Sequence, residues 1–238
     1  MYVRSLGIVL READYKDYDK MLTIFTRDFG KLSAIARGAR KQGSPLLACS
    51  DVFCCADYSF YRTKDHASIS QAQTVSSFFN IRSDIDALTA ASIFADVCDK
   101  TAMEGEANAR LFALLASALY SLDGGCDPCS VLVFFAFKAL DILGIRPHMN
   151  SCVSCGAPAT DKVNIALGGA VCENCEGERI SHYSFEQIKH IFTVASKNMA
   201  GELPAADGEL LSLAERWLVY SLDVRPKGFK LLHSLTGI

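Results

Sequence analysis

The stretch KMLTIFTRDFGKLSAIARGARKQGSP, residues 20–45, decides the fold of the first third of the chain. Two segments that favour β-strands, 20–28 and 30–38, are joined around Phe29 and Gly30. Gly30 can take the positive φ that a tight connection between strands requires. We therefore expect an antiparallel hairpin. In a chain whose formal net charge is −3, its second strand leads into a turn of small residues with three cations, Arg37, Arg40 and Lys41.

Three more strand segments surround this hairpin. Segment 2–12 alternates partly between apolar and polar residues, and segments 51–62 and 67–79 also favour strands. A longer break at 37–50 separates the third strand from the fourth. Five strands in ~80 residues with such a break predict a barrel of the OB type, and the alternative is another five-stranded barrel, such as an SH3-like one.

Beyond Phe79 the pattern changes to helical periodicity. Ser83 is a plausible N-cap for the first helix, and Ser184 with Gln187 forms a capping-box pair for a later one. The segment that Pro128 opens is apolar nearly all round, which predicts a buried central helix. Six helices are expected, over residues 83–102, 107–122, 128–144, 184–199, 208–222 and 227–235.

Residues 150–180 show little periodicity and contain four cysteines with the spacing Cys-x2-Cys-x16-Cys-x2-Cys. Two residues between thiolates let one turn present both sulfurs to one ion, and this spacing is typical of zinc sites. Four thiolates complete a tetrahedral shell with no position left for water, so we predict one structural zinc ion and not a catalytic one. The alternative is four free thiols. The expected ligands are Cys152, Cys155, Cys172 and Cys175.

The predicted fold class is α+β: an N-terminal OB-type β-barrel followed by an all-helical domain with an inserted four-cysteine zinc module. The expected division is an OB-fold nucleic-acid-binding domain at 1–80, a helical domain formed by 81–149 and 181–238, and a zinc-binding module at 150–180.

Composition excludes several classes of protein. Half the residues are hydrophobic and 21% are charged, which is typical of a globular chain and not of a disordered one. No apolar run reaches the roughly 18–20 residues of a membrane span, and the N-terminus becomes charged too early for a signal peptide. We expect a cytoplasmic protein with no membrane partner, whose ten cysteines are buried thiols or metal ligands and not disulfides.

Nothing in the sequence assembles a catalytic site. The motifs GxSxG and HExxH are absent. Segment 38–44 approaches a phosphate-binding loop, but Ser44 stands where that loop needs lysine, and Pro45 follows. The sequence therefore predicts a protein that is not an enzyme. A hydrolase with an unrecognised site is the least favoured hypothesis.

Positive charge is concentrated in the predicted barrel. Residues 1–80 carry 11 Lys and Arg against 8 Asp and Glu, whereas the rest of the chain has a net charge of −6. In an OB barrel the middle strands and the loop between the fourth and fifth strands form the nucleic-acid face. Tyr15, Tyr18, Phe29 and Tyr61 are candidates for base stacking there, although packing in the core is the favoured role for each. For the basic cluster the alternative is a solvated turn. The candidate phosphate contacts are Lys20, Arg27, Lys31, Arg37, Arg40, Lys41, Arg62 and Lys64.

Four features together resemble RecO, the bacterial recombination-mediator and DNA-annealing family. They are GIVLR at 7–11, LTIFTRDFGKLSAIARGARKQGSPL at 22–46, the four-cysteine insertion within a helical half, and VRPKGFKLL at 224–232. The resemblance implies an OB domain that binds single- and double-stranded DNA, annealing of complementary strands, and help in loading recombinase onto strands coated by SSB. It implies SSB, RecR and RecA as partners, and association with the bacterial nucleoid.

The resemblance also assigns residues. It implies that the four cysteines bind zinc and that the helical half binds the SSB tail. The acidic balance of residues 81–238 departs from the strongly basic surface expected of such a protein. The basic residues of the matched stretch carry over as DNA contacts: Arg27, Lys31, Arg37, Arg40 and Lys41.

A second hypothesis fits the same motifs. The chain would then be a zinc-ribbon adaptor protein whose OB domain binds RNA or another protein. Annealing of complementary oligonucleotides distinguishes the two hypotheses, because an adaptor has no reason to accelerate it.

Overall fold

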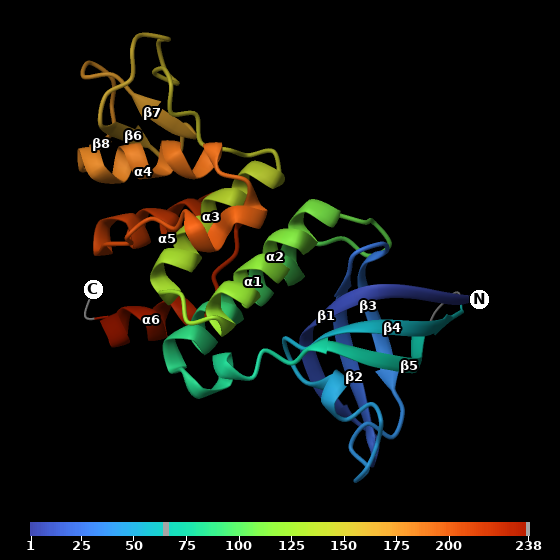
Figure 1. Cartoon of the computed structure of the whole chain (residues 1–238). Coiled ribbons are helices and arrows are strands. Elements are labelled where there is room, and N and C mark those ends of the chain that lie inside the picture. The colour runs from blue at the N-terminus through green and yellow to red at the C-terminus, as the bar shows by residue number, and fades with distance from the viewer. Residues whose placement is uncertain (64–66, 237–238) are drawn as a thin grey trace.

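The structure, a computed structural model, describes residues 1–63 and 67–236 (Figure 1). Its N-terminal part is a closed five-stranded barrel with the strand order β1-β2-β3-β5-β4, in which β4 pairs back onto β1. Neighbouring strands are antiparallel except for the parallel pair of β3 and β5. This confirms the OB-type barrel. The strands are β1 (Tyr2–Tyr15), β2 (Asp19–Thr26), β3 (Gly30–Ala36), β4 (Cys55–Arg62) and β5 (Ala67–Ser76).

The barrel has two apolar regions. Its interior is filled by alternate residues of the strands, among them Val9, Leu22 and Phe60, which are fully buried. At the end that faces the helices, Ile8 and Phe25 belong instead to the main core of the molecule, which continues through the helical half. The barrel and the helices are therefore packed together and do not form two separate cores.

The helical half follows the expected order. Its central helix α3 is buried at every position from 130 to 140, as its apolar sequence predicts. Three short 3-10 turns lie at Ala48–Ser50, Asn80–Ser83 and Ser196–Gly201. The helices are α1 (Ile85–Thr101), α2 (Ala109–Asp123), α3 (Pro128–Ile142), α4 (His182–Thr193), α5 (Gly208–Leu222) and α6 (Gly228–Thr236).

The cysteine-containing insertion, residues 150–180, folds around a small antiparallel sheet of order β7-β6-β8. Its strands are β6 (Lys162–Asn164), β7 (Gly169–Val171) and β8 (Glu178–Arg179). We call this insertion the four-cysteine module. In Figure 1 it lies beside α4, at the end of the helical half that is farthest from the barrel.

Two predicted helix caps are wrong by a few residues. Asp84, not Ser83, caps α1, because its carboxylate accepts hydrogen bonds from the backbone N–H groups of Asp86 and Ala87. Ser181, not Ser184, caps α4, because its hydroxyl accepts from the N–H of Ser184. In both places another residue nearby is an equally good cap by type, so residue type alone does not fix where the helix begins.

Candidate metal centre and nucleic-acid interface

The four predicted metal ligands meet in the four-cysteine module. Their sulfur atoms all lie within 4.8 Å of one another. The Sγ of Cys155 is 3.6 Å from that of Cys172 and 3.7 Å from that of Cys175. A tetrahedral zinc ion with Zn–S bonds of about 2.3 Å requires sulfurs about 3.8 Å apart. The four cysteines therefore fit one tetrahedrally coordinated metal ion.

Each cysteine pair is presented by a tight turn. The N–H of Gly156 donates to the carbonyl of Cys152 at 2.9 Å, and the N–H of Cys175 donates to that of Cys172 at 3.2 Å. Cys152 and Cys172 are buried against Val171, whereas Cys155 is exposed. A metal ion held by all four cysteines would have no open position for a substrate, which is the arrangement of structural sites.

The pKa values of the thiols show why a cation suits the cluster. Burial raises the pKa of Cys152, but backbone N–H groups that donate to its sulfur outweigh this effect and bring the pKa down to about 6. The Ser154 hydroxyl lowers the pKa of Cys175, but the three neighbouring sulfurs raise it to about 12. Four thiolates this close repel one another, and a divalent cation removes that cost.

The turn that follows β3 carries three cations of stretch 20–45, namely Arg37, Arg40 and Lys41. Gly38 has φ +65, and its N–H donates to the Asp19 carboxylate at 2.8 Å. The N–H of Arg40 donates to the carbonyl of Tyr18 at 3.0 Å, while Ala39 is fully buried. Two backbone hydrogen bonds, from Gly38 and Arg40, thus fix the turn to the start of β2 and the residue before it, which leaves the long side chains on the outside of the turn.

The three cations of this turn differ in what they already contact. Arg40 is 3.3 Å from the Asp14 carboxylate, and the Lys41 ammonium lies 5.5 Å from the centre of the Tyr18 ring. Arg37 is exposed and makes no side-chain hydrogen bond or ion pair within residues 1–63 and 67–236. It lines a hollow of 680 Å³ whose other walls include Arg4, Ser44, Gln71 and Gln73.

The other side chains predicted to contact phosphate lie elsewhere on the barrel or already pair with carboxylates. Lys20 donates to Glu12 at 2.8 Å and to Asp51 at 3.2 Å. At the opposite end of the barrel Arg27 pairs with Asp28, Lys31 pairs with Asp99, and Arg62 lies over the Phe29 ring. The structure therefore brings Arg37, Arg40 and Lys41 together but divides the seven predicted residues that it describes between the two ends of the barrel. Lys64 is outside the described residues.

Sequence reasoning missed two contributions to this surface. Arg4 holds Asp57 through two hydrogen bonds of 2.8 Å and projects beside the hollow that Arg37 lines. Tyr2 and Tyr61 are exposed, with ring centroids 5.1 Å apart. Only Tyr61 was a candidate for stacking. The pairing of β1 with β4 sets these contacts, and no local pattern of residues predicts it.

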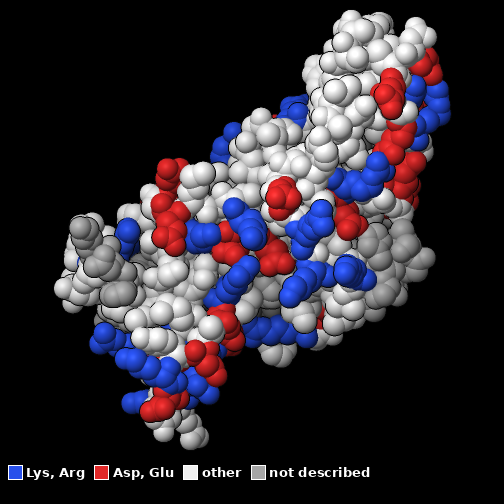
Figure 2. All heavy atoms as spheres, turned by 180° about the vertical axis from the view of Figure 1, so that it is seen from behind, with Lys and Arg blue, Asp and Glu red and all other residues white. Residues whose placement is uncertain are grey.

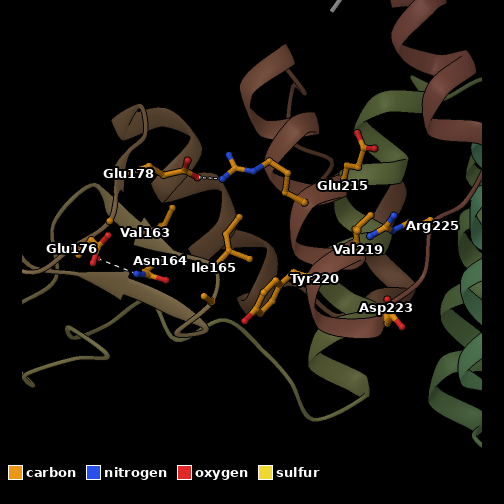
Figure 3. Close-up of a pocket in the computed structure, with 13 residues that line it drawn as sticks. Val163, Asn164, Ile165, Glu176, Glu178, Glu215, Val219, Tyr220, Asp223 and Arg225 are labelled. Carbon is orange, nitrogen blue, oxygen red and sulfur yellow. Dashed lines mark hydrogen bonds and ion pairs between the residues drawn. The ribbon is translucent and has the colours of Figure 1, made fainter.

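A cleft of 810 Å³ lies between the sheet of the four-cysteine module and α5 (Figure 3). Val163, Ile165, Val219 and Tyr220 supply its apolar wall. Its charged residues comprise four carboxylates and two guanidinium groups, of which Arg216 pairs with Glu178 at 2.7 Å. This balance favours a cationic segment over an acidic one, so the cleft is a poor match for an acidic peptide.

None of the helices that the structure describes has both the length and the apolar character that a membrane span requires.

A closed OB-type barrel joined to a helical bundle defines a barrel-and-bundle class of protein, here with a candidate nucleic-acid surface and four cysteines that could hold a metal ion. Comparison with known families is more specific. The family model described as recombination protein O N terminal matches residues 1–78, and that described as recombination protein O C terminal matches residues 82–223. The chain belongs to the recombination protein O (RecO) family, which confirms the resemblance seen in the sequence.

Curated relatives agree along most of the chain. It is 33% identical over 180 residues to a protein of Alkaliphilus metalliredigens, covering 74% of this chain and 73% of the relative. It is 30% identical over 200 residues to one of Caldicellulosiruptor saccharolyticus, covering 83% and 82%. It is 29% identical over 243 residues to one of Moorella thermoacetica, covering 97% and 90%. Each of the three is named DNA repair protein RecO.

Proposed function

We propose that the protein is a non-enzymatic mediator of DNA repair and recombination. It binds single- and double-stranded DNA, anneals complementary strands, and helps to load recombinase onto strands coated by SSB. The observation that carries this proposal is the exposed basic turn at 37–41 on an OB barrel, in a family whose relatives are named DNA repair proteins.

The turn suits contact with a phosphate backbone. The guanidinium of Arg37 has no competing carboxylate within the described residues and can donate two hydrogen bonds to one phosphate. Lys41 adds a point charge, and Gly38 with the buried Ala39 keeps the turn slim enough for a strand to approach. Backbone contact carries no sequence information, which suits a protein that acts on any sequence.

Annealing follows from the same contacts. Two complementary strands repel each other through their phosphates, and cations that neutralise one strand lower that repulsion for the second. Exposed aromatic side chains at Tyr18 and at the Tyr2–Tyr61 pair offer surfaces on which an unpaired base can stack.

The partners we propose are SSB, RecR and RecA, and the place of action is the bacterial nucleoid in the cytoplasm. We also propose zinc as the metal of the four-cysteine cluster, and the division of the chain into a DNA-binding domain at 1–80, a helical domain at 81–149 with 181–238, and a zinc module at 150–180. The acidic tail of SSB would bind the helical half outside the acid-lined cleft described above.

An annealing assay tests this proposal against the adaptor hypothesis. Two complementary oligonucleotides, one with a fluorophore and one with a quencher, are mixed with and without protein, and again after coating with SSB. We expect the protein to accelerate annealing, and the Arg37→Ala variant to do so less. A control variant, Lys189→Ala, removes a cation that pairs with Glu186 on α4 and should act as the unchanged protein does. No acceleration by the unchanged protein would favour the adaptor.

A further inference from the structure

A second cationic hollow lies at the junction between the barrel and the helical half. It has a volume of 390 Å³, and β1, α1 and the segment that joins α5 to α6 form its walls. Figure 2 shows Lys and Arg side chains across the middle of the rear face, with Asp and Glu side chains among them. We call this hollow the seam site. Its lining residues are Arg11, Asp96, Lys100, Val224, Arg225, Pro226 and Lys227.

The local sequence builds one wall by alternation. Val224 and Pro226 are buried, whereas Arg225 and Lys227 are exposed, which is the period of two of an extended segment. Gly228 then begins α6 directly against α1, because a Cβ at this position would lie 2.7 Å from the Ile93 side chain. The two cations are therefore held beside α1 by buried residues on either side of them.

The opposite wall is already arranged by ion pairs. Arg11 follows an irregularity in the pairing of β1 with β2 and lies 2.7 Å from Asp99 and 3.9 Å from Asp96. Asp99 also accepts from Lys31 at 3.3 Å. The two carboxylates thus hold the Arg11 side chain in place in the wall of the hollow.

Three cations of the seam site remain without such partners. Within the part of the chain that the structure describes, the side chains of Lys100, Arg225 and Lys227 make no hydrogen bond or ion pair. The two carboxylates, Asp96 and Asp99, already face Arg11 and Lys31. The site therefore has an excess of positive charge, although residues 81–238 as a whole are acidic.

We propose that the seam site binds a phosphate group of a nucleic-acid backbone and so extends the DNA contact from the barrel onto the helical half. This inference rests on the proposed function. Lys100 and Lys227 supply point charges, and Arg225, which lines both this hollow and the cleft beside α5 (Figure 3), adds a guanidinium between the two. The described residues that line the hollow include no aromatic side chain, so the contact is with phosphate and not with a stacked base.

The test compares two double variants of the full chain. Arg225→Ala with Lys227→Ala removes two cations of the seam site. Arg179→Ala with Lys189→Ala removes two cations that already pair with Glu173 and Glu186. Binding of a labelled single strand is followed by fluorescence anisotropy over a salt series. The seam variant should flatten the slope of log affinity against log salt by about 1.4, since each lost phosphate contact on a single strand contributes about 0.7. The control should keep the slope.

Further arms separate the possible outcomes. The charge-conserving variant Arg225→Lys with Lys227→Arg should keep the slope, and thermal unfolding should show that all variants are folded. A seam variant with the same slope as the control overturns the inference. If the Arg37→Ala variant weakens binding in that case, the proposed function stands without the seam site. If the unchanged protein binds no DNA, both fall. Binding to phosphatidylglycerol vesicles that the seam variant loses, with an unchanged DNA slope, would reassign the site to lipid phosphate.

Discussion

Gly30, the first residue of β3, lies in close contact with the segment that joins α1 to α2. It has φ +66, and a Cβ at this position would lie 2.2 Å from the carbonyl oxygen of Glu106 and 2.5 Å from that of Met103. Gly105, in the same junction, also has a positive φ, +78, but nothing lies within 4 Å of its Cβ position. Both positions therefore have a left-handed backbone that glycine adopts freely, but only Gly30 lies in close contact with another segment.

We predict that Gly30→Ala destabilises the protein much more than Gly105→Ala does. The first substitution combines left-handed strain with a backbone clash and should lower the free energy of unfolding by about 2–4 kcal/mol. The second carries only the strain, about 1–2 kcal/mol. Urea unfolding followed by the fluorescence of Trp217, the single tryptophan, measures both. Equal losses in the two variants would show that the close contact at Gly30 is unimportant.

Lys138 is a charged residue in the buried helix α3, only 5% exposed. Burial lowers the pKa of its ammonium group from 10.5. The folded state therefore holds this proton less tightly than the unfolded state does, so the charge destabilises the fold below the lowered pKa. That destabilisation disappears as the pH rises toward 10.5.

We accordingly predict that Lys138→Met is more stable than the unchanged protein at pH 7, and that the difference shrinks as the pH approaches 10.5. Buried thiols such as Cys98, whose pKa is raised by burial, titrate in both proteins, so their effect cancels in the comparison. Urea midpoints at several pH values give the difference, and a gap that stays constant with pH would refute this assignment.

At the scale of elements, local patterns predicted most of the fold. The five strands and six helices follow from residue type and periodicity, and the cysteine spacing predicted a cluster that the structure brings together. The partners of the cations were not predictable. Lys31 pairs with Asp99, 68 residues further along the chain, because the barrel packs against α1. The seam site was missed for the same reason, since its cations lie on segments far apart in sequence.

The four-cysteine module gives a prediction at the same scale. Replacing Cys152 and Cys172 with serine should abolish zinc binding and make residues 150–180 sensitive to proteases, because metal binding and folding of such modules are coupled. DNA binding by the remote barrel should persist. The matched control replaces Cys126 and Cys129, two thiols outside the cluster. Metal analysis should find one zinc ion per chain in the control and none in the variant. Zinc absent from the unchanged protein would contradict the assignment.

At the scale of the whole molecule, one core crosses the boundary between the barrel and the helices. Phe25 of β2 and Phe112 of α2 are buried in it, with ring centroids 5.8 Å apart in an edge-to-face arrangement. The two halves should therefore unfold in one transition. Phe112→Ala should lower the stability by about 3–5 kcal/mol and shift both Trp217 fluorescence and amide-exchange protection of β2 equally. Protection of β2 that is unchanged while Trp217 shifts would mean that the barrel is stable alone.

The central claim is that the turn after β3 holds a DNA backbone, and the salt dependence of single-strand binding tests it most directly. The measurement compares the unchanged protein with the variant in which Arg37, Arg40 and Lys41 are all alanine. If each contacts one phosphate, the log–log slope flattens by about 2. Binding weakens alike on every sequence, and thermal stability barely changes, because exposed cations contribute little to folding. Arg37→Ala alone gives the largest single change, since Arg40 already pairs with Asp14. An unchanged slope and affinity in the folded triple variant would contradict the claim.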